Sequence, residues 1–92
     1  MEPLPNFAAY SVSKAALVAL AKNVAAENKD LGITANVVLP STIDTAPNRQ
    51  AMAKSDFSRW VKPESIAKTL VWLASREAGD VSGAVIPIYG RA

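Results

Sequence analysis

The sequence predicts an α/β fold whose elements follow the order helix, strand, loop, helix, strand. Two segments repeat apolar residues at helical spacing, and two short runs are rich in β-branched residues. A strand, a helix and another strand in this order predict a right-handed parallel crossover. With 92 residues, 50% of them hydrophobic and 20% charged, the chain has the composition of a single globular domain, residues 1–92.

The first predicted helix covers residues 8–27. Ala, Leu, Lys and Glu dominate this segment, and all four are good helix formers. Its apolar residues predict a wide buried face made of one stripe and a second stripe beside it. The first stripe contains Val12, Ala16, Leu20 and Val24, and the second contains Leu17, Ala21 and Ala25.

The rest of the chain divides at its glycines and prolines. Gly32 suits a left-handed turn after the first helix, Pro40 ends the strand that follows, and Pro63 fits the first position of a second helix. The expected elements are a strand at 33–39, a short helix at 46–53 within the long segment 41–61, a helix at 63–75 and a strand at 84–88.

Composition excludes several kinds of chemistry. With no Cys and no His, the chain has no disulfide, no thiolate nucleophile and no imidazole base, and we expect no metal site. The 10 basic residues are spread along the sequence and the net charge is only +2, so nucleic acid is not an expected partner. The longest apolar run, 15–21, is far too short to cross a bilayer, and we expect no membrane association and a cytoplasmic protein.

Tyr10 and Lys14 are the residues with the clearest chemical potential. Four residues apart on a helix, they lie about 40° apart on the same face, so both side chains can reach one reacting centre. A phenol becomes useful for proton transfer near neutral pH when an adjacent ammonium group stabilises the phenolate. Taken alone, the pair is also a common arrangement on solvent-facing helices.

Three blocks give the pair a context. They are Tyr10-Ser11-Val12-Ser13-Lys14, then Asn36-Val37-Val38-Leu39-Pro40-Ser41-Thr42-Ile43-Asp44-Thr45, and finally Lys62-Pro63-Glu64-Ser65-Ile66-Ala67 leading to the last strand. Together they resemble the C-terminal portion of the short-chain dehydrogenase/reductase family, with the dihydropteridine reductase branch looking most similar. The resemblance covers essentially the whole chain.

The resemblance implies a fold, a cofactor and a set of roles. The fold would be the C-terminal part of a Rossmann-like, doubly wound parallel sheet, and the reaction hydride transfer between NAD or NADP and a carbonyl or alcohol carbon. Tyr10 would be the general acid/base, and Lys14 would stabilise the tyrosinate and hydrogen-bond the nicotinamide ribose. Pro40, Ile43 and Thr45 would complete the cofactor-binding set.

The chain departs from the family pattern at three points. Ser41 stands where the family usually has Gly, Tyr89-Gly90-Arg91 stands where a Gly-Gly pair is common, and the catalytic Ser expected upstream of Tyr10 has no counterpart. The glycine-rich turn that holds the pyrophosphate is missing as well. We therefore expect weak or absent cofactor binding by this chain alone. The alternative is a non-catalytic oligomerising fragment without redox activity.

The remaining candidates have structural interpretations. Asp44, Asp56 and Glu64 share no spacing that predicts a carboxylate pair, so they are expected to be caps or solvated groups. Ser13 is expected to bond back to a preceding carbonyl. The wide apolar face of the helix 8–27 needs more than one covering neighbour, which predicts a homodimer or homotetramer through this helix.

Overall fold

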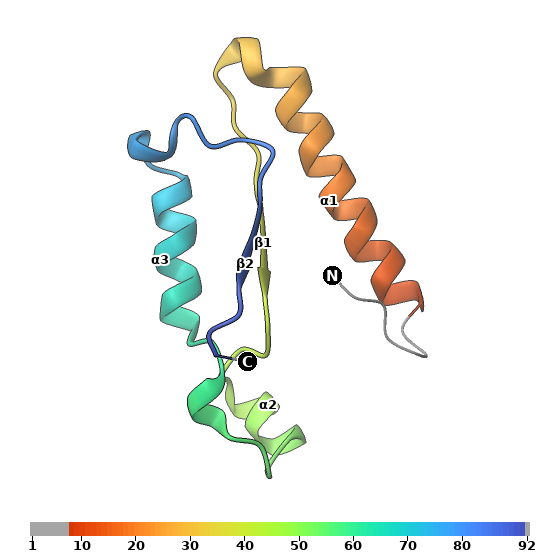
Figure 1. The fold of residues 1–92 in the computed structure, drawn as a ribbon, viewed down its shortest axis with the longest axis vertical. Coiled ribbons are helices and arrows are strands. Elements are labelled where there is room, and N and C mark those ends of the chain that lie inside the picture. Colours follow the sequence, from red (N-terminus) through yellow and green to blue (C-terminus); the bar gives the residue numbers. More distant parts are fainter. Residues whose placement is uncertain (1–7, 92) are drawn as a thin grey trace. The chain divides into compact units, whose positions relative to one another are not determined.

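The computed structural model describes residues 8–91, and its order of elements confirms the predicted α/β arrangement (Figure 1). The long helix extends one residue beyond the predicted end. The helix predicted at 63–75 begins at Pro63, as predicted. The helices are α1, Ala8–Asn28, α2, Ala46–Ala51, and α3, Pro63–Leu73, and the strands are β1, Val37–Pro40, and β2, Val85–Ile88.

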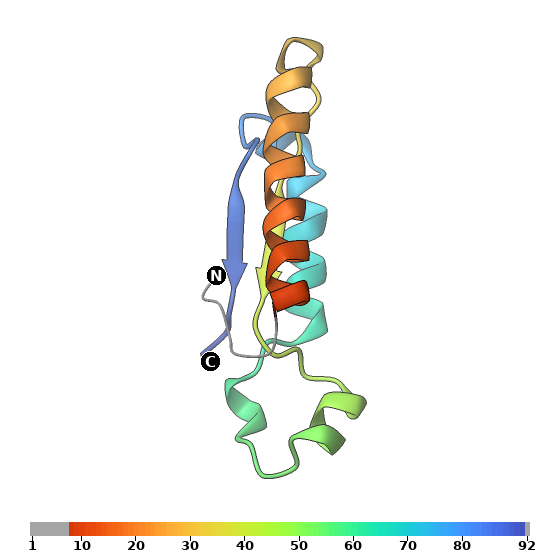
Figure 2. The ribbon, with the colours of Figure 1, turned by 90° about the vertical axis from the view of Figure 1, so that its right-hand side faces the viewer.

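Strands β1 and β2 are neighbours in one sheet and run in the same direction (Figure 2). The Val37 N–H donates to the Ala84 carbonyl at 3.0 Å, and the Ser41 N–H donates to the Ile88 carbonyl at 3.2 Å. Both bonds have the same offset between the strands, which is the register of a parallel ladder. The parallel pairing predicted from the order of elements is therefore confirmed.

Strand β1 is shorter than the predicted strand 33–39, because the residues before it are paired mostly through side chains, with one backbone bond from the Gly83 N–H to the Ala35 carbonyl at 2.8 Å. The Asn36 side-chain amide donates to the Val81 carbonyl at 3.0 Å, and its oxygen accepts from the Ala84 N–H at 3.0 Å. The Ser82 hydroxyl accepts from the Ala35 N–H at 3.2 Å. A side chain that takes over backbone partners in this way competes with regular pairing.

The chain divides into two compact units, and each is described separately. The first unit contains the residues up to Val37 together with Val81–Val85. Within it, α1 ends in a 3₁₀ turn that Gly32 closes in the left-handed conformation, at φ 71°, as predicted. Ala25 is buried, and a Cβ on Gly83 would lie 3.7 Å from the Ala25 Cβ. The helix therefore packs closely on the turn before β2.

The buried face predicted for α1 is wrong in its first half, whereas Ala21, Val24 and Ala25 lie at half-buried or buried positions as predicted. Val12 is 68% exposed and Leu20 is 59% exposed, and Ala16 is exposed as well. The half-buried or buried positions of the helix are Ser11, Lys14, Val18, Ala21, Val24, Ala25 and Asn28. Because apolar residues occur all round this helix, their spacing alone does not reveal which side faces the rest of its unit.

The second unit contains Val38–Asp80 and the residues from Ile86 on. The short helix α2 stops at Ala51 rather than at the predicted residue 53. Helix α3 ends at Leu73, two residues before the predicted end, and Leu70 on its predicted apolar stripe is 49% exposed. Among the described residues of this unit, Val61 and Ala78 are the buried apolar ones. No helix of the described residues is long and apolar enough to span a membrane.

Candidate active site

Tyr10 and Lys14 lie near the start of α1 and are brought together as predicted. The Lys14 Nζ is 5.4 Å from the centre of the Tyr10 ring, a distance at which the ammonium is attracted to the ring face. Tyr10 is 56% exposed, and Lys14 is half-buried. The phenol is thus accessible to a reactant, with a cation beside it.

Ser13 and Ser11 lie between the two residues on the same helix. The Ser13 hydroxyl donates to the Ala9 carbonyl at 2.8 Å, which confirms the back-bonding expected from the sequence. Ser13 is exposed and its hydroxyl is committed to the backbone, so Tyr10 and Lys14 remain the chemically relevant pair of this helix.

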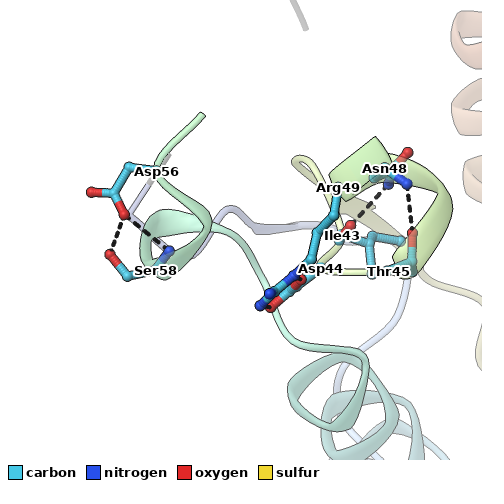
Figure 3. A network of polar contacts seen from close by, with 7 residues as sticks. All are labelled: Ile43, Asp44, Thr45, Asn48, Arg49, Asp56 and Ser58. Atoms are coloured by element: carbon cyan, nitrogen blue, oxygen red, sulfur yellow. Dashed lines mark hydrogen bonds and ion pairs between the residues drawn. The ribbon is translucent and has the colours of Figure 1, made fainter. Parts of the chain in front are cut away.

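The other predicted cofactor residues lie at the end of β1 and just after it, in the second unit. Pro40 ends the strand, and Thr45 caps α2, its hydroxyl oxygen accepting from the Asn48 N–H at 3.3 Å. The Asn48 side chain in turn donates to the Ile43 carbonyl at 2.8 Å (Figure 3). Asn48 is thus hydrogen-bonded to both Ile43 and Thr45, so we expect these two residues to keep a fixed position relative to each other.

Asp44, between them, is held by an ion pair. The Arg49 Nε lies 2.6 Å from the Asp44 Oδ1, and the Arg49 Nη2 lies 2.9 Å from its Oδ2 (Figure 3). The hydrogen bond from Arg49 is the main cause that lowers the pKa of the Asp44 carboxyl, and the charges of Arg49 and Lys62 add to it. A paired, ionised carboxylate of this kind fixes the loop and is unsuited to accept a proton near neutral pH.

Aromatic contacts extend this network. The Arg49 guanidinium lies 4.6 Å from the centre of the Phe57 ring, and the Phe57 and Trp60 rings are 4.8 Å apart. Asp56 accepts from both the N–H and the hydroxyl of Ser58, which lowers the pKa of its carboxyl and confirms its predicted role as a cap (Figure 3). These residues form structural contacts along the loop, and no acid/base pair of carboxylates is formed among them.

Sequence reasoning missed two residues that shape this loop. Asn48 and Arg49 were not singled out, although both act on positions three to five residues before them. The available signal was the Thr45 cap followed by Pro47, which predicts that the next residues turn back toward the segment before the helix. No group of three or more potential metal ligands occurs among the described residues.

Comparisons with known proteins identify the class. The family described as enoyl-(acyl carrier protein) reductase matches residues 2–90. The chain is 34% identical to 2-(S)-hydroxypropyl-CoM dehydrogenase 3 of Xanthobacter autotrophicus over 95% of its own length and 40% of the relative's. It is 35% identical to the inactive 2-(S)-hydroxypropyl-CoM dehydrogenase 2 of the same organism, over 95% of the chain and 44% of the relative.

A solved structure agrees with these relatives. Against 4-hydroxyisoleucine dehydrogenase complexed with NADH, the TM-score is 0.80 at 27% identity, and the match covers 90% of this chain and 38% of the other. The chain therefore belongs to the short-chain dehydrogenase/reductase family, as its motifs predict, and its fold is part of that family's Rossmann fold. It spans less than half the length of the relatives it matches. The placement in the dihydropteridine reductase branch stays a prediction.

Proposed function

We propose that this chain supplies the acid/base centre of an NAD(P)-dependent oxidoreductase that reduces a carbonyl or oxidises an alcohol. The observation that carries the proposal is the position of the Lys14 ammonium, 5.4 Å from the centre of the accessible Tyr10 ring, in a chain of this family. The nicotinamide would donate or accept the hydride. Tyr10 would donate its phenolic proton to the carbonyl oxygen during reduction and take it back during oxidation.

Lys14 has two tasks in this proposal. Its positive charge stabilises the tyrosinate left after proton donation, and its remaining N–H donors can bind a ribose hydroxyl. The half-buried position of Lys14 supports both tasks, because water screens its charge less than at a fully exposed site.

The residues present fit the nicotinamide end of a dinucleotide. The Thr45 hydroxyl accepts one hydrogen bond from Asn48, so its own proton is available to a carboxamide oxygen. Ile43 offers an apolar side chain, and Pro40 ends the strand that leads into this segment. The four glycines, Gly32, Gly79, Gly83 and Gly90, include no closely spaced set for the pyrophosphate. We therefore expect residues 1–92 alone to bind NADH or NADPH weakly or not at all.

A chimera tests the proposal. In it, this chain replaces the matching segment of 2-(S)-hydroxypropyl-CoM dehydrogenase 3, which provides the remaining part of the family fold. We expect NAD(P)-dependent turnover from the chimera, and loss of turnover with retained circular dichroism in its Tyr10→Phe variant. Ser13→Ala, which removes a hydroxyl committed to the Ala9 carbonyl, is the matched control. Near-normal turnover by Tyr10→Phe would refute the role of Tyr10.

The second candidate is a non-catalytic oligomerising module. The apolar residues Val12, Leu17 and Leu20 are exposed on α1, and burying their exposed area stabilises an assembly by a fraction of the about 1.5 to 3 kcal/mol that complete burial of such a side chain contributes. In either case we propose a homodimer or homotetramer through α1, acting in the cytoplasm as one domain without nucleic-acid or membrane partners. A folded chimera without turnover would favour this second candidate.

A further inference from the structure

The segment after β2, residues 89–91, is bonded reciprocally to the turn before α3. The Arg91 N–H donates to the Arg59 carbonyl at 3.0 Å. In return, the Arg59 guanidinium donates to the Arg91 carbonyl from Nε at 3.1 Å and from Nη2 at 3.0 Å. Three bonds thus join the same two residues, and two of them come from a charged donor, which makes stronger hydrogen bonds than a neutral one.

Gly90 allows this close approach. Its φ is +62°, and a Cβ at this position would lie 3.1 Å from the Arg59 carbonyl oxygen and 3.2 Å from the Val61 Cγ2. A larger residue would have to displace backbone as well as adopt a strained conformation. The absence of a side chain at Gly90 therefore allows segment 89–91 to lie directly against residues 59–61.

Residues 59–61 are in turn paired with the loop that follows β1. The Val61 N–H donates to the Thr42 carbonyl at 3.1 Å, and the Asp44 N–H donates to the Val61 carbonyl at 2.7 Å. These bonds form a parallel bridge between Ile43 and Val61, and Val61 is only 3% exposed. The contacts therefore run without a break from segment 89–91 to Ile43.

A second connection reaches the same loop directly. The Ser41 hydroxyl donates to the Tyr89 carbonyl at 2.7 Å, next to the ladder bond from the Ser41 N–H to Ile88. Ser41 is a departure from the family pattern, and a glycine at position 41 has no hydroxyl to make this bond, whereas the acceptor at position 89 is a backbone carbonyl that any residue supplies. Ser41 is thus joined directly to a residue 48 positions away, at the start of segment 89–91.

We propose that segment 89–91 is a clamp that fixes the loop carrying Ile43 and Thr45, and that Arg59 and Ser41 are positioning residues. Arg59 acts through Val61, and Ser41 acts at the point where the loop leaves β1. The assignment of Ile43 and Thr45 to the nicotinamide rests on the proposed function, whereas the clamp itself rests only on the contacts within this unit.

Hydrogen exchange of the full chain, read by NMR or mass spectrometry, tests the clamp. We expect Arg59→Ala to speed exchange of the Asp44 and Val61 amides at least tenfold, with α1 unchanged. Arg59→Lys, which keeps a charged donor, should restore part of the protection. Arg76→Ala, a change of the same kind on another exposed arginine of this unit, should have no such effect. Equal exchange in Arg59→Ala and Arg76→Ala overturns the clamp.

If Arg59→Ala does not fold, the Ser41→Ala variant tests the same clamp. It removes only the bond to Tyr89, and we expect faster exchange limited to residues 41–44 and 88–91. Unchanged exchange there would also overturn the clamp. In the active chimera, Arg59→Lys should raise the KM for NAD(P)H severalfold with little change in kcat. If exchange changes but the KM does not, the loop has no role in cofactor binding, and the clamp proposal still stands. An inactive chimera would count against the proposed function alone.

Discussion

The Arg49 guanidinium donates two parallel hydrogen bonds to the Asp44 carboxylate, and the bond from its Nε is 2.6 Å long. The pair spans the start of α2, with Asp44 just before the Thr45 cap and Arg49 in the helix. It therefore links the loop after β1 to the short helix that continues it. Because Arg49 also lies over the Phe57 ring, one guanidinium joins three parts of the loop.

The first prediction concerns the titration of Asp44. Its pKa is lowered from the ordinary 3.8 mainly by the hydrogen bond from Arg49. A carboxyl with a lowered folded-state pKa stabilises the fold above its unfolded pKa, and this contribution is lost as pH falls through the folded value. We expect the Asp44 carboxyl to titrate below 3.8 by carbon NMR, and Arg49→Gln to raise its midpoint. Identical midpoints in the two proteins would contradict the ion pair.

The second prediction concerns the cap of α2. Thr45→Ala removes the oxygen that accepts from Asn48, which should cost about 0.5 to 2 kcal/mol in the free energy of unfolding. Thr45→Ser keeps an accepting hydroxyl and should recover most of this loss. Urea denaturation of the three proteins measures the difference. Equal stability of the Ala and Ser variants would show that the cap contributes nothing.

The third prediction concerns Gly32, which ends the first helical segment at φ 71° with open space where a Cβ would lie. A Cβ there meets no other atom within 4 Å, so the cost of Gly32→Ala is the backbone strain alone, about 1 to 2 kcal/mol. Asn tolerates this conformation better than Ala, and Gly32→Asn should cost less. Thermal denaturation at fixed concentration provides the comparison, and an alanine variant as stable as the original would exclude the strain.

The fourth prediction concerns assembly through α1. Leu17 is 46% exposed and Leu20 is 59% exposed, and replacing both with Gln removes apolar area without adding charge. We expect the double variant to shift sedimentation toward smaller species at micromolar concentration. Lys22→Gln, an exposed change on the same helix, should leave the distribution as it is. A double variant that assembles like the original would place the interface elsewhere.

The sequence was sufficient for the type and order of the main elements. Helix propensity, the left-handed Gly32 and Pro63 at a helix start are local signals, and the structure agrees with them. The predicted start of β1, residue 33, is too early, because the Asn36 side chain bonds to Val81 and Ala84. These partners lie 45 and 48 positions later in the sequence. Local propensity carries no information about such a distant partner.

The part of the candidate site that depends on local geometry was predictable from the sequence, and the part that depends on distant partners was not. Tyr10 and Lys14 are close because helical geometry alone brings positions four apart together. The pairing of Ile43 with Val61 and of Ser41 with Tyr89 depends on how the chain returns to the sheet. Likewise, the orientation of α1 could not be read from its apolar residues, because they occur on every side of it.

The bonds between Asn36 and residues 81 and 84 also have a consequence for synthesis on the ribosome. Asn36 precedes its two partners by 45 and 48 residues, respectively. At about 5 to 20 residues per second, these partners leave the ribosome roughly 2 to 10 s after Asn36 does. During that time β1 has no β2 to pair with, and its unpaired edge is open to other strands. Because β1 pairs with a strand that is made seconds later, its edge stays open for longer than in a hairpin, whose two strands are adjacent in the sequence.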